Sequence, residues 1–279
     1  MEPLRPRTIR DGLAVYCFGD GEPMLLMPGP HRFQRPGLRS ADELIDGLVG
    51  LGRAVVTFDP PGSGSSTRPA DLGMSEMYGC AVEALDACGV TGPVDALGHS
   101  MAGLVLLAYL LDRPQRLRRV VLVGTGSGGP AYMRAPGAMW NRGHPAFPAV
   151  AALGSLHLLL RRRGSERALN NLIERHSFHD PGQARPEPIG PGDWLQPAEG
   201  FAHWHTIARK IDLSGRLGDV ARPVLVVCGA HDPQFPPSCS RELESGIPGA
   251  RLVLFPDSGH YPFIEEPAPF WQEVGSFLP

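Results

Sequence analysis

Short apolar runs alternate with longer helical patterns along most of this chain, and this alternation constrains the fold more than any other feature. The short runs are typical of buried strands and occur at Leu13–Phe18, Met24–Met27, Ala54–Phe58, Val94–Leu97, Val120–Val123, Val224–Cys228 and Arg251–Phe255. Stretches with apolar residues three or four positions apart, which indicate helices, occur at Ala41–Leu51, Ser75–Cys88, Met101–Leu111, Ser238–Ser245 and Pro269–Phe277. Strands that alternate with helices form a mostly parallel sheet, because a parallel crossover needs a long connection. We therefore expect an α/β fold in which helices flank a mostly parallel sheet on both faces.

The alternation stops after Val123 and resumes at Pro223, and the segment between them has a different composition. It contains three of the four tryptophans and six of the ten histidines. Helical patterns return within it at Pro148–Leu160, Ser165–His176 and Gly200–Ile211. We interpret residues 126–215 as a helical cap insertion, and residues 1–125 and 216–279 as one core domain that the insertion interrupts.

Composition and charge exclude several classes of protein. Hydrophobic residues make up 42% of the chain and charged residues 20%, which indicates a folded globular protein. The net charge is −3, and basic residues are scattered except at Arg161–Arg163, so we expect no nucleic-acid partner. The five cysteines are odd in number and lack CxxC spacing, which argues against disulfides and a zinc cluster. The histidine pairs of the insertion lack a third ligand in a recognisable motif, so we expect neither a metal nor another cofactor.

The apolar segments bear on location. Residues 1–12 contain arginines but no apolar run of the kind that secretory signals need. The longest apolar runs, near Leu104–Leu111 and Leu156–Leu160, fall short of the roughly 20 residues that span a bilayer. We therefore expect a cytoplasmic protein with no membrane partner.

The segment Val94–Gly103, with the sequence Val-Asp-Ala-Leu-Gly-His-Ser-Met-Ala-Gly, carries the strongest local signal for chemistry. An apolar strand is followed by a tight turn and an apolar helix, a pattern that holds Ser100 at the tip of a strand and at a helix N-terminus. Small residues are needed where strand and helix almost touch, and Gly98 meets that need. Ala102 stands where the G-x-S-x-G pattern has its second glycine, but alanine is small and Gly103 follows. The alternative interpretation is that Ser100 only caps the helix.

At this point the chain resembles the α/β-hydrolase superfamily, in particular its capped members related to proline iminopeptidases and small esterases. A second matching segment runs from Phe58 to Thr67, with the sequence Phe-Asp-Pro-Pro-Gly-Ser-Gly-Ser-Ser-Thr. It is similar to the D-x-R-G-x-G-x-S loop of that family, with Pro61 in place of the usual arginine. The resemblance implies an α/β-hydrolase fold with a helical cap, and a structural role without chemistry for Asp59.

The resemblance also implies an acid and a base that follow the serine along the chain. A serine hydroxyl is a weak nucleophile until an imidazole takes its proton, and a carboxylate must hold that imidazole in one tautomer. Asp232 comes just after the strand Val224–Cys228, and His260 comes just after the next strand. We predict a catalytic triad of Ser100, Asp232 and His260. Asp257 and His231 are weaker candidates for the acid and the base.

Two further features support this assignment. The other position that could carry the acid, directly after the strand Val120–Val123, offers only Gly124, Thr125 and Gly126. Dehalogenases and epoxide hydrolases of this fold attack with an aspartate, whereas this turn carries a serine. Acyl transfer is therefore the expected reaction class.

The oxyanion hole must supply hydrogen-bond donors to the negative charge that develops on the substrate oxygen. The backbone N–H of Met101 is one expected donor. The second usually comes from the loop after an early strand, where relatives carry His-Gly-x and use the N–H of the third residue. Here the matching position is Pro30, which has no N–H. The N–H of His31, the N–H of Gly29 and the His31 side chain are the alternative donors, and we predict the N–H of His31.

These features predict a serine hydrolase that cleaves a small-molecule carboxylic ester or lactone through an acyl-enzyme. The Trp, Met, Phe and Leu content of the insertion favours an apolar and bulky substrate. Three alternatives stay open: a proline iminopeptidase-like aminopeptidase, an acyltransferase or perhydrolase with the same triad, and a non-catalytic small-molecule receptor.

Overall fold

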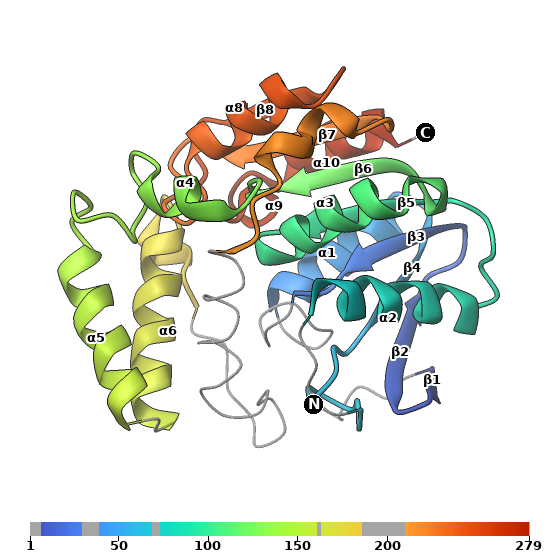
Figure 1. The fold of residues 1–279 in the computed structure, drawn as a ribbon, viewed down its shortest axis with the longest axis horizontal. Coiled ribbons are helices and arrows are strands. Elements are labelled where there is room, and N and C mark those ends of the chain that lie inside the picture. The colour runs from blue at the N-terminus through green and yellow to red at the C-terminus, as the bar shows by residue number, and fades with distance from the viewer. Residues whose placement is uncertain (1–6, 30–38, 69–72, 161–162, 186–209, 279) are drawn as a thin grey trace.

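The computed structural model describes residues 7–29, 39–68, 73–160, 163–185 and 210–278 (Figure 1). The strands are β1 (Thr8–Arg10), β2 (Leu13–Phe18), β3 (Glu22–Met27), β4 (Arg53–Phe58), β5 (Val94–His99), β6 (Leu117–Val123), β7 (Val224–Gly229) and β8 (Arg251–Phe255). The helices are α1 (Arg39–Gly50), α2 (Met74–Ala87), α3 (Met101–Asp112), α4 (Gly129–Arg134), α5 (Phe147–Leu160), α6 (Arg163–Ser177), α8 (Pro237–Gly246), α9 (Pro262–Glu265) and α10 (Pro267–Phe277). Every strand that the apolar runs predicted is present, and β1, α4 and α9 are additional elements.

The strands form one sheet in the order β1-β2-β4-β3-β5-β6-β7-β8. The pairs β1–β2 and β2–β4 are antiparallel, and every later pair is parallel. The fold is an α/β-hydrolase fold, as the sequence predicted. Because parallel strands point the same way, the carboxyl ends of β5, β6, β7 and β8 meet at one edge of the sheet.

Each face of the sheet has its own hydrophobic core. Successive residues of a strand point to opposite faces, so Met24 and Leu26 of β3 join one core while Leu25 and Met27 join the other. Helices α2, α3 and α8 cover the face of Leu25, and α1, α9 and α10 cover the face of Met24. The expected layer of helices on both sides is therefore observed (Figure 1).

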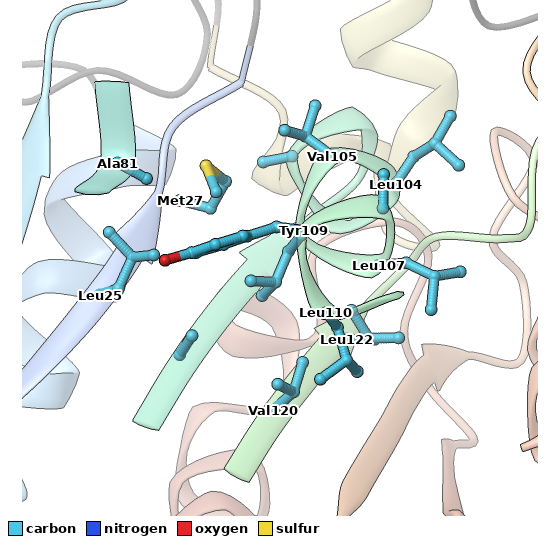
Figure 2. Packing of buried hydrophobic residues seen from close by; sticks show 14 of the residues in the cluster. Leu25, Met27, Ala81, Leu104, Val105, Leu107, Tyr109, Leu110, Val120 and Leu122 are labelled. Atoms are coloured by element: carbon cyan, nitrogen blue, oxygen red, sulfur yellow. The ribbon is translucent and has the colours of Figure 1, made fainter. Parts of the chain in front are cut away.

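Helix α3 is the central element of the first core. Ten of its twelve residues are buried, so it is apolar on all sides, as only an enclosed helix can be. Figure 2 shows Leu104 and Val105 of this helix among the buried residues of the cluster, and its Tyr109 extending toward Leu25. This packing fixes the start of α3, directly after Ser100, against the sheet.

The two ends of the segment that the sequence predicts as an insertion lie beside each other. Leu213 N–H donates to Ser127 O at 2.9 Å, and Gly128 forms an isolated bridge with Asp212. Beyond these points α5 and α6 lie side by side as a helical hairpin (Figure 1). These two helices match the helical patterns predicted there. The third predicted helix, Gly200–Ile211, falls almost entirely outside the described residues.

The loop after β4 has the structural role that the family resemblance implied. Tyr16 Oη and the backbone N–H of Ser65 both donate to Asp59 Oδ2, each at 2.7 Å. Gly64 has a φ of +54°, and a Cβ there would strike the Asp59 carboxylate. Asp59 therefore closes its own loop, and the glycine is needed because of the backbone conformation and the close contact.

Neither disulfides nor membrane-spanning helices are found in the described part of the chain. All five cysteines are free thiols. None of the described helices combines the length and the apolar character that crossing a lipid bilayer requires.

Candidate active site

Ser100 occupies a sharp turn between β5 and α3. Its φ of 58° lies in the left-handed region, which is strained for a residue with a side chain and typically costs about 1–3 kcal/mol. Its backbone N–H donates to Val123 O at 2.8 Å, which fixes the turn to the end of β6. Such strain persists only where the surrounding structure imposes it, and it is common at functional sites.

The glycines around Ser100 explain how the strand and the helix approach so closely. A Cβ on Gly98 would lie 2.8 Å from Ala102 O and 2.9 Å from Gly103 Cα, so strand and helix backbones are in contact there. A Cβ on Gly103 would lie 2.7 Å from Thr125 Cβ. The contact of α3 with β5 therefore requires glycine at position 98, and the contact of α3 with the segment after β6 requires glycine at position 103. Ala102 is accommodated as a fully buried side chain.

Asp232 and His260 follow β7 and β8, and the structure brings their side chains into contact. His260 Nδ1 lies 2.8 Å from Asp232 Oδ2, and both residues are almost completely buried. A carboxylate oxygen accepts, so Nδ1–H donates, and a neutral ring then has Nε2 as its acceptor. The backbone N–H groups of Gln234 and Phe235 donate to Asp232 Oδ1 at 2.8 and 2.9 Å, which fixes the carboxylate.

Gly124, the residue directly after β6, lies against this acid and base. A Cβ on Gly124 would lie 3.1 Å from both Asp232 Oδ2 and His260 Nδ1. Its neighbour Val123 accepts the Ser100 N–H. The three predicted triad residues therefore surround the end of β6. A side chain at position 124 would crowd the contact between Asp232 and His260, and the positive φ of Gly124 disfavours one.

A comparison with known proteins agrees with this geometry. The alpha/beta hydrolase family matches residues 24–273, which is most of the chain. The chain belongs to this family.

This chain is similar to two curated relatives and to one solved structure that have different names. A 2-hydroxy-6-oxononadienedioate/2-hydroxy-6-oxononatrienedioate hydrolase from Cupriavidus pinatubonensis is 26% identical and covers 97% of this chain and 93% of the relative. A pimeloyl-(acyl-carrier protein) methyl ester esterase from Aromatoleum aromaticum is 30% identical over 63% of this chain and 70% of the relative. An alpha/beta fold hydrolase from Bacillus anthracis superposes with a TM-score of 0.75 at 19% identity, covering 95% of both chains.

The predicted oxyanion donors are placed only in part in this member of the alpha/beta hydrolase family. Met101 is the first residue of α3, and N–H groups in the first turn of a helix have no partner within the helix. The positive end of the helix dipole adds to their attraction for an anion. The second predicted donor, His31, lies with Pro30 in residues 30–38, outside the described residues, and stays a prediction.

The weaker candidates of the sequence analysis have other surroundings. His231 stacks on His179 with the ring centroids 3.9 Å apart. Asp257 is exposed, and its backbone N–H donates to Glu266 Oε2 at 3.0 Å. Among the described residues no three His, Cys, Asp or Glu side chains are grouped as metal ligands, and His203 and His205 lie outside that part.

The sequence did not predict the role of His99, which contacts the predicted base through its backbone carbonyl and its ring. His99 is buried, and its Nε2–H donates to the backbone carbonyl of His260 at 2.9 Å. Its ring also packs against that of His260, with centroids 4.5 Å apart. The position of His99 directly before Ser100 is the only sequence signal for this role, and it does not indicate the partner of the ring.

Glu174, on α6, brings a second, partly buried carboxyl group near the predicted base. Tyr261 Oη donates to Glu174 Oε2 at 2.9 Å, and burial raises the pKa of this carboxyl above its ordinary value. A raised pKa means that folding favours the protonated form. The stability contribution of this group is therefore present below about pH 4.3 and is lost as the pH rises through the raised pKa.

A Glu174→Gln variant is expected to have the same free energy of unfolding as wild type at low pH and a larger one at neutral pH. The amide keeps an acceptor for Tyr261 but carries no charge to bury. Urea unfolding at pH 4 and pH 7.5 measures the difference, with the exposed Glu244→Gln as control. A Glu174→Gln variant that is less stable at neutral pH than at pH 4, relative to wild type, would contradict the expectation.

Proposed function

We propose that this protein is a serine hydrolase that cleaves a carboxylic ester or a lactone through an acyl-enzyme. Ser100 is the nucleophile, His260 the general base and acid, and Asp232 the residue that orients the imidazole. The observation that carries the proposal is the buried contact of 2.8 Å between His260 Nδ1 and Asp232 Oδ2, beside a serine in a strained turn. A buried pair of this kind stabilises a fold no more than a well-packed apolar pair would, so stability alone does not explain its presence.

The proposed reaction has two acyl-transfer steps. Ser100 Oγ attacks the carbonyl carbon while its proton moves to His260 Nε2, and Met101 N–H donates to the carbonyl oxygen as it becomes negative. The C–O bond to the leaving alcohol then breaks, and His260 Nε2 returns the proton to that oxygen. Water repeats the sequence on the acyl-enzyme, which releases the acid and restores the Ser100 hydroxyl.

The relatives and the insertion support an ester-like substrate. The relative from Aromatoleum aromaticum is named as a methyl ester esterase. The hairpin of α5 and α6 is rich in leucine, and Leu159 is 81% exposed. A cap of this composition suits an apolar substrate, because burial of apolar surface is the main source of affinity in such sites.

A second candidate function is the hydrolysis of a carbon–carbon bond beside a ketone. Three curated relatives, 25–28% identical to this chain, are named as hydrolases of oxononadienedioate compounds. Such a compound carries a ketone and two carboxylates, with no ester in its name. The same base and oxyanion donors could catalyse this reaction. The two candidate functions therefore differ in their substrate and not in the proposed triad.

A panel of substrates tests the proposal. We expect the largest kcat/KM on an ester or a lactone with an apolar acyl chain, compared with a proline anilide, a carbamate and a 2-hydroxy-6-oxo dienedioate. Each rate is corrected by the rate with Ser100→Ala. Faster turnover of the dienedioate would establish the second candidate, and faster turnover of the proline anilide would establish the aminopeptidase alternative. The acyltransferase alternative predicts that an added alcohol diverts the acyl group from water.

A further inference from the structure

The C-terminal end of α6, which belongs to the insertion, contacts the loop that carries His260. The backbone N–H of His260 donates to the carbonyl of Ser177 at 2.6 Å. Gly259 makes room for this contact, because a Cβ there would collide with Ser177 O and lie 2.9 Å from His179 N. The proposed base is therefore held by a residue that lies outside the core domain predicted from sequence.

The same residue also contacts the loop that carries Asp232. Gln234 Nε2 donates to Ser177 Oγ at 2.8 Å, while Gln234 N–H donates to Asp232 Oδ1 at 2.8 Å. The Ser177 hydroxyl in turn donates to Ile173 O at 2.6 Å, within α6. Ser177 is completely buried, so these bonds do not compete with water.

Glu265 adds a second link between the two segments. Its Oε1 accepts from the backbone N–H of His179 at 2.7 Å, and its Oε2 accepts from Gly259 N–H at 2.7 Å. One carboxylate thus holds the residues after α6 against the residue before His260. Phe178 and Tyr261 also pack ring on ring, with centroids 4.8 Å apart.

We propose that Ser177 is a positioning residue for the acid and the base, which rests on the proposed function. Asp232 and His260 stand on loops after two different strands, and Ser177 bonds to both loops at once. Ser177 thereby fixes the spacing of the two loops. That spacing in turn sets the 2.8 Å contact between His260 Nδ1 and Asp232 Oδ2. The insertion therefore does more than cover substrate: its helix α6 completes the geometry of the pair.

Ser177→Ala tests the proposal, with Ser165→Ala as its matched control. Ser165 is a buried serine on the same helix, and its hydroxyl lies 3.2 Å from His157 Nδ1 on α5. Both variants lose one buried hydroxyl of α6, but only the Ser177 hydroxyl bonds to the acid loop, through Gln234 Nε2. The backbone carbonyl that accepts from His260 N–H stays in place, so Ser177→Ala removes the link between the two loops at its side-chain end. We expect kcat to fall by about 10- to 100-fold in Ser177→Ala with KM nearly unchanged, and to stay near wild type in Ser165→Ala. Ser177→Thr, which keeps the hydroxyl, is expected to recover most of the rate.

A proton NMR measurement gives a readout that needs no turnover. A histidine Nδ1–H held in a short hydrogen bond to a carboxylate resonates far downfield, and we expect Ser177→Ala to shift or broaden this signal while Ser165→Ala preserves it. Equal kcat in the two alanine variants, together with an unchanged downfield signal, would overturn the proposal. A wild type that hydrolyses no substrate would refute the proposed function, and the signal alone would then decide the role of Ser177.

Discussion

Replacing Ser100 with alanine is expected to lower kcat by at least about 10⁴-fold, because no other group then forms the covalent bond to the acyl carbon. The variant is expected to fold, since alanine is smaller than serine and the turn is fixed by its backbone bond to Val123. The free energy of unfolding should stay within about 1 kcal/mol of wild type. Steady-state kinetics on the best substrate of the panel, with urea unfolding, measure both quantities.

A remote serine provides the control for that loss. Ser276 lies on α10, and its hydroxyl donates to Glu273 O at 2.9 Å. Ser276→Ala should therefore keep the wild-type rate. A Ser100→Ala variant that retains more than about one-tenth of the wild-type kcat would show that Ser100 is not the nucleophile.

Replacing Asp232 with asparagine is expected to lower kcat by about 10⁴-fold while the fold is kept. The amide oxygen can still accept from the N–H groups of Gln234 and Phe235, as Oδ1 does now. The amide NH₂ then faces His260 Nδ1, which must become an acceptor, so the proton moves to Nε2. With a proton on Nε2, the imidazole cannot take one from the Ser100 hydroxyl.

Asp257→Asn is the matched control for the assignment of the acid. Asp257 also precedes His260 closely in the sequence, but it is exposed. We expect its substitution to change kcat by less than about threefold, as an exposed residue away from the chemistry should. If Asp257→Asn abolished turnover and Asp232→Asn did not, the acid would have been misassigned.

The elements that the sequence predicted share a strong periodic signal. Strands such as β6 and β7 are runs of Val and Leu buried on both faces, which few other structures accommodate. The missed elements lack that signal. Strand β1 has three residues, two of them exposed, and α9 has four residues, so neither shows a period. Helix α4 begins with Gly129-Pro130, which a sequence pattern indicates as a turn.

The candidate site could be predicted where strand direction decides it. Ser100, Asp232 and His260 each follow a strand, and a parallel sheet brings such positions to one edge. The contact of His260 with Ser177 could not be predicted in this way. It depends on where the end of α6 packs, and no short-range pattern records the packing of an insertion on its core. The bond from His99 is an intermediate case, because its position was known but its partner was not.

Covalent labelling with a fluorophosphonate tests the central claim most directly. The reagent phosphonylates a serine only where a base activates the hydroxyl, and mass spectrometry of the digested protein locates the modified residue. We predict one phosphonyl group on the peptide that contains Ser100, and none in the His260→Ala variant at the same reagent concentration. Folded wild-type protein that stays unlabelled at Ser100 would contradict the account and favour a small-molecule receptor on the hydrolase fold.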